Sequence, residues 1–274
     1  MGAARFAFAA LFFYYICCIW PATFSKEITE PVDPKAKRVD YRPMDKNGRP
    51  MMGYINPDCD DGKRRLNVDY DARKLDLSCG YHDALKFSFV TGLAPPKLTC
   101  DIIPPHYHPP HYCMDTRIKY PSRIPTFEGH RPLWPRYGEY DYVPPQRWLH
   151  SIEHGAVVML YHPCARWGHV QKLRTLVKNC IRKHIITPYL GLTPKRPLAL
   201  VSWGCRLEMS FVKTADVVAF IRYFALNGPE GHLATDGQYS WGLVEGASVV
   251  KGSDFQDSNL CPFYKQRVTK PRAE

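Results

Sequence analysis

The sequence predicts an α+β fold, a small sheet with helices packed on it, over residues 121–250. Two strand-like apolar runs, a partner strand after the second run and two amphipathic segments support this prediction, in the order strand, helix, strand, strand, helix. Cysteines spread along the rest of the chain predict disulfides that stabilise the fold. The chain has 274 residues, 45% of them hydrophobic, which is enough to bury a core.

Each element follows from a local pattern. Residues 156–161 and 198–203 are apolar runs typical of strands buried on both faces, and a partner strand is expected over 206–212. Residues 167–184 and 216–226 carry apolar side chains at helical spacing. A short helix is predicted to end at His154, because a proline pair precedes it and Gly155 follows.

The flanking regions have weaker patterns. Residues 26–120 form a predicted Pro- and Cys-rich irregular extension, in which 85–90 is the best candidate strand, and residues 251–274 form a C-terminal tail. Asp58, Asp60 and Asp61 lack the spacing of a calcium-binding loop, so a solvated turn is expected there.

The first 25 residues have the pattern of a secretory signal peptide. Arg5 precedes an apolar run over 6–20, and cleavage is expected after Ser25. The run is short for a membrane-spanning helix, although an uncleaved signal anchor is the alternative. The prediction is therefore a secreted or lumenal protein, or a membrane-anchored one if the signal stays attached.

Eight of the ten cysteines remain after the predicted cleavage. An even number in an exported chain predicts four disulfides, whose pairing the sequence leaves open. Because no two of these cysteines form a C-x-x-C pair, a four-thiolate zinc site is poorly supported. The eight residues are Cys59, Cys79, Cys100, Cys113, Cys164, Cys180, Cys205 and Cys261.

The strongest chemical motif is H-x-x-E-H at residues 150–154. On a helix, His150 and His154 lie four residues apart on one face and can hold one zinc ion. Glu153 stands beside them, where it could deprotonate a metal-bound water. A third ligand is needed, and the candidates are His130, His162 and Glu208.

The motif has a second interpretation. His150 and His154 could instead hydrogen-bond buried backbone or the Glu153 carboxylate, with no metal. Gly155 and the following strand end the helix directly after His154, which argues against the long active-site helix of an H-x-x-E-H protease. A metal site that uses His130, His150 and His154, with zinc or copper, is kept as the alternative to a protein without a cofactor.

Residues 104–113 are rich in proline and histidine. Four prolines favour polyproline II, which repeats every three residues, so His108 and His111 would share one edge and His106 another. One alternative is a surface copper or zinc site, and the other is an extended strap that packs its tyrosines on the domain.

The net charge of +11 is concentrated in one region. Eight basic residues and no acidic ones lie between residues 164 and 197. Arg174, Lys178 and Arg182 recur every four residues along one side of the predicted helix, which suits an unknown protein partner or an anionic surface. Nucleic acid is not expected as a partner, because export conflicts with it.

Standard enzyme motifs are missing from the sequence. The chain contains no G-x-S-x-G, G-x-G-x-x-G or Walker sequence. The sequence therefore favours a non-enzymatic interaction module, with Glu153 as the catalytic residue only if the protein is a metal-dependent hydrolase.

Several short motifs resemble a known family. The segments over about residues 120–225 resemble the tumor protein p53-inducible protein 13 family and a broader domain of unknown function found in bacterial membrane-anchored proteins. The resemblance rests on Gly129–Pro132, Tyr137–Tyr140, His150–Gly155, Tyr161–Ala165 and Arg196–Met209. It implies no established enzymatic activity and a link to negative regulation of cell growth. It also implies that Tyr161 belongs to the shared pattern with His130, His150, Glu153 and His154.

Overall fold

The computed structural model describes residues 55, 57–88, 93–233, 235–265 and 269–273. The predicted signal peptide, residues 1–25, lies outside the described residues. Within residues 35–274, which form one compact unit, the described part contains a seven-stranded sheet and four α-helices. The predicted α+β class is confirmed.

The elements follow one another along the chain with their bounds as follows. The helices are α1 (Tyr81–Ser88), α2 (Pro145–Glu153), α3 (Trp167–Lys178) and α4 (Thr214–Phe224), with a 3₁₀ turn at Leu66–Val68. The strands are β1 (Lys97–Cys100), β2 (Gly138–Tyr140), β3 (Val157–Tyr161), β4 (His184–Pro188), β5 (Leu198–Ser202), β6 (Cys205–Met209) and β7 (Leu243–Gly246).

The sheet is mixed, with the strand order β1-β6-β5-β3-β4-β2-β7. Strand β4 runs parallel to both β3 and β2, and the other pairs are antiparallel. Helix α3 makes the crossover between the parallel neighbours β3 and β4, which the antiparallel hairpin β5–β6 then extends. The central strands β3, β4 and β5 are buried along both faces, as the apolar runs predicted for β3 and β5.

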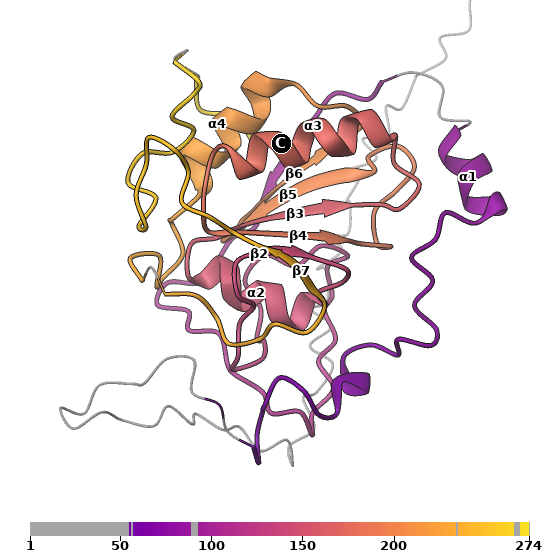
Figure 1. The fold of residues 1–274 in the computed structure, drawn as a ribbon, viewed down its shortest axis with the longest axis vertical. Coiled ribbons are helices and arrows are strands. Elements are labelled where there is room, and N and C mark those ends of the chain that lie inside the picture. Colours follow the sequence, from indigo (N-terminus) through magenta and orange to yellow (C-terminus); the bar gives the residue numbers. More distant parts are fainter. Residues whose placement is uncertain (1–54, 56, 89–92, 234, 266–268, 274) are drawn as a thin grey trace, which may run out of the picture. The chain divides into compact units, whose positions relative to one another are not determined.

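Side-chain alternation along β3 divides the core into two layers. Val157 and Met159 face α3 and α4, whereas Val158 and Leu160 face α2. In Figure 1, α3 and α4 accordingly lie on one side of the sheet and α2 on the other. Gly155 has a φ of +81°, and a side chain there would strike the backbone of Leu226, so glycine is required in the tight turn from α2 to β3.

Two local predictions are wrong. The predicted strand at 85–90 overlaps α1, and the predicted helix over 167–184 ends at Lys178. After Lys178 the chain turns through Cys180, which is bonded to Cys261, and enters β4 at His184. Cys180 and Ile181 are buried in the core after the helix has ended. Their spacing from the apolar residues of α3 matches a helix only by coincidence.

All eight predicted cysteines form disulfides. The pairs are Cys59–Cys113, Cys79–Cys164, Cys100–Cys205 and Cys180–Cys261. Such bonds persist in oxidising compartments, so the four disulfides fit the secretory pathway or the extracellular space. Among the described residues, no helix is long and apolar enough to cross a membrane.

Candidate metal centre

Four side chains from three segments converge on one buried point. We call His111, His130, His150 and Glu153 the His–Glu cluster, because one ligand atom from each lies within 4.8 Å of the others. His130, His150 and Glu153 are at most 1% exposed, and His111 is 10% exposed. Helix α2 supplies His150 and Glu153, and the loops before it supply the other two.

Backbone pairing brings the two loop histidines together. The strap, residues 104–113, meets residues 128–131 in a short parallel bridge between His111 and His130. Tyr112 donates its backbone N–H to the His130 carbonyl at 2.9 Å, and His130 donates to the Pro110 carbonyl at 3.0 Å. Gly129 permits this approach, since a β-carbon there would lie 2.6 Å from the Tyr112 ring.

Hydrogen bonds to backbone fix the tautomers of two rings. His150 Nδ1 lies 2.7 Å from the Arg131 carbonyl, and His130 Nδ1 lies 3.0 Å from the Glu128 carbonyl. A carbonyl only accepts, so Nδ1 of each ring carries a proton. In a neutral ring the Nε2 atom then presents a lone pair. Backbone carbonyls hold metal-binding imidazoles in the same way in known sites.

The Nε2 atoms of the three histidines have different neighbours. His130 Nε2 lies 3.0 Å from a Glu153 carboxylate oxygen, and His111 Nε2 lies 3.9 Å from the same oxygen. His150 Nε2 is buried with no hydrogen-bond partner in the described part of the chain. Burial, followed by the neighbouring His130, lowers the pKa of His150 well below its usual value, so this ring is neutral.

The structure places His154 beside this cluster but outside the group of four. Its ring packs 4.2 Å from Trp134 and 4.9 Å from His150, measured between centroids. Its Nδ1 lies 3.6 Å from a Glu230 carboxylate oxygen. Burial is the largest influence on its pKa, which falls to about 3.

The other predicted site residues have separate surroundings. His162 stacks on Phe87 at 3.9 Å and accepts a hydrogen bond from the Cys164 backbone. Glu208 pairs with Arg123, and Tyr161 packs near the Arg174 guanidinium. None of the three belongs to the His–Glu cluster.

Sequence reasoning missed His111 as a partner of the motif. His108, predicted to share an edge with it, is exposed, as is His106. Polyproline periodicity predicts which residues share an edge but not which edge faces the domain. The parallel bridge to His130 and the Cys59–Cys113 bond select His111, and neither was apparent from the spacing.

A network of buried ion pairs surrounds the cluster. Arg147 on α2 donates to both carboxylate oxygens of Asp60, one of them at 2.8 Å, and both side chains are at most 1% exposed. Arg131 pairs with Asp69 in the same way. The expectation that Asp58, Asp60 and Asp61 form a solvated turn is therefore wrong for Asp60.

The predicted basic face is paired with acidic residues in the structure. Arg174 and Lys178 both contact Glu139 at 2.9 Å, and Lys178 also contacts Glu245. Arg182 lies beyond the end of α3, is 2% exposed and pairs with Asp236. An anionic partner for this region stays a prediction.

The fold and the cluster define a class of protein: a disulfide-bonded α+β domain with a buried three-histidine, one-carboxylate constellation. Residues 111–237 match the family described as "Protein of unknown function (DUF3105)". All four cluster residues lie inside that match, which covers slightly less than half of the chain.

The chain is similar to tumor protein p53-inducible protein 13, as its motifs predicted. It is 36% identical over 59 residues to the protein of Rattus norvegicus and 34% identical over 67 residues to that of Mus musculus. These matches cover 22% and 24% of this chain, and 15% and 17% of the relatives. No solved structure matches the chain.

Proposed function

We propose that the protein is a secreted or lumenal metal-binding protein in which the His–Glu cluster holds one Zn²⁺ ion. The observation that carries this proposal is the approach of His130 Nε2 to the Glu153 carboxylate at 3.0 Å. The ring already donates its Nδ1 proton to the Glu128 carbonyl, so a neutral His130 turns its Nε2 lone pair toward the carboxylate. A cation between them satisfies both.

Three imidazoles and one carboxylate are ligands that zinc accepts, and imidazole also suits copper. Around a tetrahedral zinc with bonds of about 2.0–2.2 Å, ligand atoms lie about 3.3–3.6 Å apart. The cluster, now within 4.8 Å, would close by on the order of 1 Å on binding. Four protein ligands fill a tetrahedral site, which supports a structural or storage role over catalysis.

The test is metal content and affinity of the purified chain. We expect one Zn²⁺ per chain in the wild type, measured by elemental analysis, and competition with a chromophoric chelator gives the affinity. His150→Ala and Glu153→Gln should each lose the ion, since each removes a buried ligand. His108→Ala is the matched control, because His108 is exposed on the same strap.

Two further variants and one metal separate the alternatives. His154→Ala should retain the ion if His111 completes the set, whereas His111→Ala should retain it if His154 does. A titration with Cu²⁺ under the same conditions distinguishes a copper site from a zinc site. A wild type that binds neither metal, with His130 and Glu153 sharing a proton instead, would overturn the proposal.

A second candidate function is an interaction module without a metal. Its support is the similarity to tumor protein p53-inducible protein 13 over about 60 residues. Negative regulation of cell growth is the role that we propose for such a module. The same metal analysis discriminates the two candidates, because a module of this kind stays folded and metal-free whatever metal is offered.

A further inference from the structure

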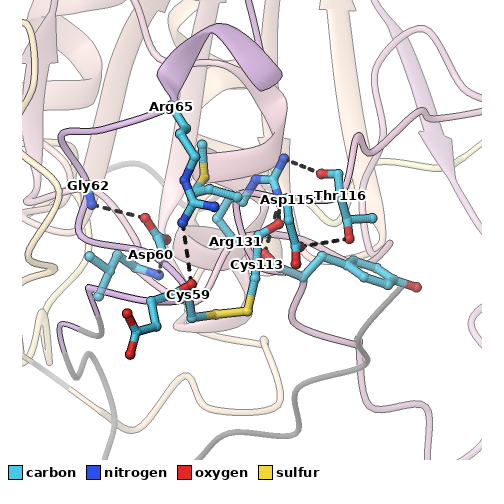
Figure 2. Close-up of a disulfide and its surroundings, with 12 residues drawn as sticks. Cys59, Asp60, Gly62, Arg65, Cys113, Asp115, Thr116 and Arg131 are labelled. Carbon is cyan, nitrogen blue, oxygen red and sulfur yellow. Dashed lines mark hydrogen bonds between the residues drawn. A yellow bond between two sulfur atoms is a disulfide. The ribbon is translucent and has the colours of Figure 1, made fainter. Parts of the chain in front are cut away.

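One disulfide lies next to the proposed metal site in both sequence and space. Cys113 follows His111 by two residues, and its bond to Cys59 is drawn in Figure 2. Both half-cystines are buried, at 5% and 4% exposure. Met114 also donates its backbone N–H to the Cys59 carbonyl at 2.9 Å, so the end of the strap is held covalently and by backbone pairing.

The other half of this disulfide is anchored to the helix that carries two cluster residues. The carboxylate of Asp60, directly after Cys59, accepts hydrogen bonds from the Arg147 guanidinium of α2 and, at 3.2 Å, from the Leu133 backbone N–H. The covalent path from His111 therefore runs through Cys113 and Cys59 to Asp60, and from there by an ion pair to α2. His150 and Glu153 lie on that helix.

Arg131 forms a second tie between the strap and the cluster. Its guanidinium donates to the carbonyls of Cys113 and, at 2.8 Å, of Thr116, and it lies beside the disulfide in Figure 2. Its own carbonyl accepts the His150 Nδ1 proton. This tie, like the backbone bridge between the strap and His130, does not depend on the disulfide. Breaking the sulfur–sulfur bond therefore removes the link from the strap to Cys59 and Asp60, while His130, His150 and Glu153 keep their places.

We propose that the Cys59–Cys113 disulfide controls how tightly the His–Glu cluster retains its metal, so that a dithiol reductant promotes metal release. The proposal rests on the proposed function of this cluster. The other three disulfides end at cysteines that lie farther than two residues from every cluster member. Among the four disulfides of the described residues, the Cys59–Cys113 bond alone joins the strap to the segment that is clamped on α2.

The chemical step is thiol–disulfide exchange with a dithiol as co-reactant. One thiolate of the dithiol attacks a sulfur of the cystine, and its second thiol then resolves the mixed disulfide. Two electrons and two protons pass to Cys59 and Cys113, which become thiols, and the dithiol becomes a disulfide. Because both cystine sulfurs belong to buried residues, the attack requires the strap to open, which a metal bound to His111 opposes.

The first test uses Zn²⁺ and the full chain with the pair replaced as Cys59→Ala and Cys113→Val, so that no thiol beside the cluster binds the metal. We expect the affinity for Zn²⁺ to fall about 10- to 100-fold, the range for losing a support of a metal ligand. Cys79→Ser with Cys164→Ser is the matched control, since Cys79 is exposed, and should keep wild-type affinity. Near-UV circular dichroism and mapping of the remaining disulfides check the fold.

The second test measures the effect of Zn²⁺ on reduction of the disulfide in the wild type. It tests the proposal even if the variant with the replaced cysteines does not fold. Binding couplings are mutual, so bound Zn²⁺ should slow reduction of Cys59–Cys113. Alkylation and mass spectrometry after timed exposure to a phosphine reductant, which supplies the same two electrons, should show this protection for Cys59 and Cys113. Cys79 and Cys164 should react at the same rate with and without the metal.

The outcomes separate this inference from the proposed function. A wild type that binds no metal overturns both. A wild type that binds Zn²⁺, with unchanged affinity in the folded Cys59→Ala, Cys113→Val variant or unchanged reduction rates, overturns only the role of the disulfide.

Discussion

The two faces of the sheet bury different chemistry. Against α3 and α4, the side chains of β3 and its neighbours meet a layer built mainly from aliphatic residues and phenylalanine, closed by the Cys180–Cys261 bond. Against α2, the apolar layer is bordered by the Asp60–Arg147 and Asp69–Arg131 pairs and by the His–Glu cluster. Both helical layers lie on the same central strands.

The difference indicates which face serves a purpose besides stability. Burying a charged pair costs desolvation that an apolar pair of the same volume does not, so such pairs contribute little to stability by themselves. A cluster of histidines around a carboxylate adds further polar atoms that need partners. The α3–α4 face can be explained by packing alone, whereas the α2 face is best explained by the site that it holds.

The largest expected effect comes from breaking a pair on the α2 face. Asp60→Asn leaves the Arg147 guanidinium buried without its carboxylate, and we expect a loss of about 3–5 kcal/mol in the free energy of unfolding. Urea denaturation measures the loss. Asp60→Leu combined with Arg147→Met should recover most of it, and a loss below about 1 kcal/mol for Asp60→Asn alone would contradict a buried pair.

A cavity on the opposite face should affect stability without affecting the metal. Leu173 on α3 is fully buried, and Leu173→Ala should cost about 2–5 kcal/mol. The affinity for Zn²⁺ should stay at the wild-type value, because α3 packs on the face away from the cluster. If Leu173→Ala weakened Zn²⁺ binding as much as Asp60→Asn did, the division of the molecule into two faces would be wrong.

His184, a buried histidine on the α3–α4 face, predicts how the stability of the protein depends on pH. His184 shares its face with its partner Val157 and donates Nδ1–H to the Ile181 carbonyl, and burial lowers its pKa to about 4. The unfolded chain therefore binds more protons between pH 4 and 6.5, so stability should fall as the pH falls through this range. The full contribution is about 3 kcal/mol.

His184→Gln should remove this contribution from the acid limb of the stability curve. Thermal melts of the metal-free wild type and variant between pH 4 and 7 measure the difference. Parallel curves for the two proteins would mean that His184 titrates normally and is not buried as described.

The smallest effect is expected at the edge of the sheet. Lys178 bridges Glu139 and Glu245, but its side chain is 26% exposed and that of Glu245 is 65% exposed. Lys178→Ala should cost only about 0.2–1 kcal/mol, less at high salt. A salt-independent loss above about 2 kcal/mol would show that the charges of α3 are as important as those under α2.

The sequence predicted the elements whose patterns are strong. The runs that became β3 and β5, the helix α2 ending at its glycine, and α4 all follow from local spacing. Strands β1, β2 and β7 have only three or four residues, partly exposed, and their pairing is set by distant partners. The conformation of such short strands depends on tertiary contacts, so periodicity does not reveal them.

The sequence likewise predicted only part of the candidate site. The H-x-x-E-H motif located His150 and Glu153, and His130 was one of three candidates for a further ligand, in a segment that the family resemblance also includes. Predicting His111 as a member would have required the position of the strap on the domain, and predicting the role of Asp60 would have required its burial. Both are set by the Cys59–Cys113 disulfide, whose pairing the sequence left open.

The pairing of β1 with β6 also has a consequence for synthesis. Cys100 and Cys205 are 105 residues apart, so β1 leaves the ribosome long before its partner strand exists. Until then, Cys100 is an unpaired thiol among others that are also waiting for distant partners. Residues 111–153, which hold the whole His–Glu cluster, emerge earlier than β5 and β6. A disulfide that Cys100 forms at this stage is therefore not the native one, and it must be reshuffled after β6 is made.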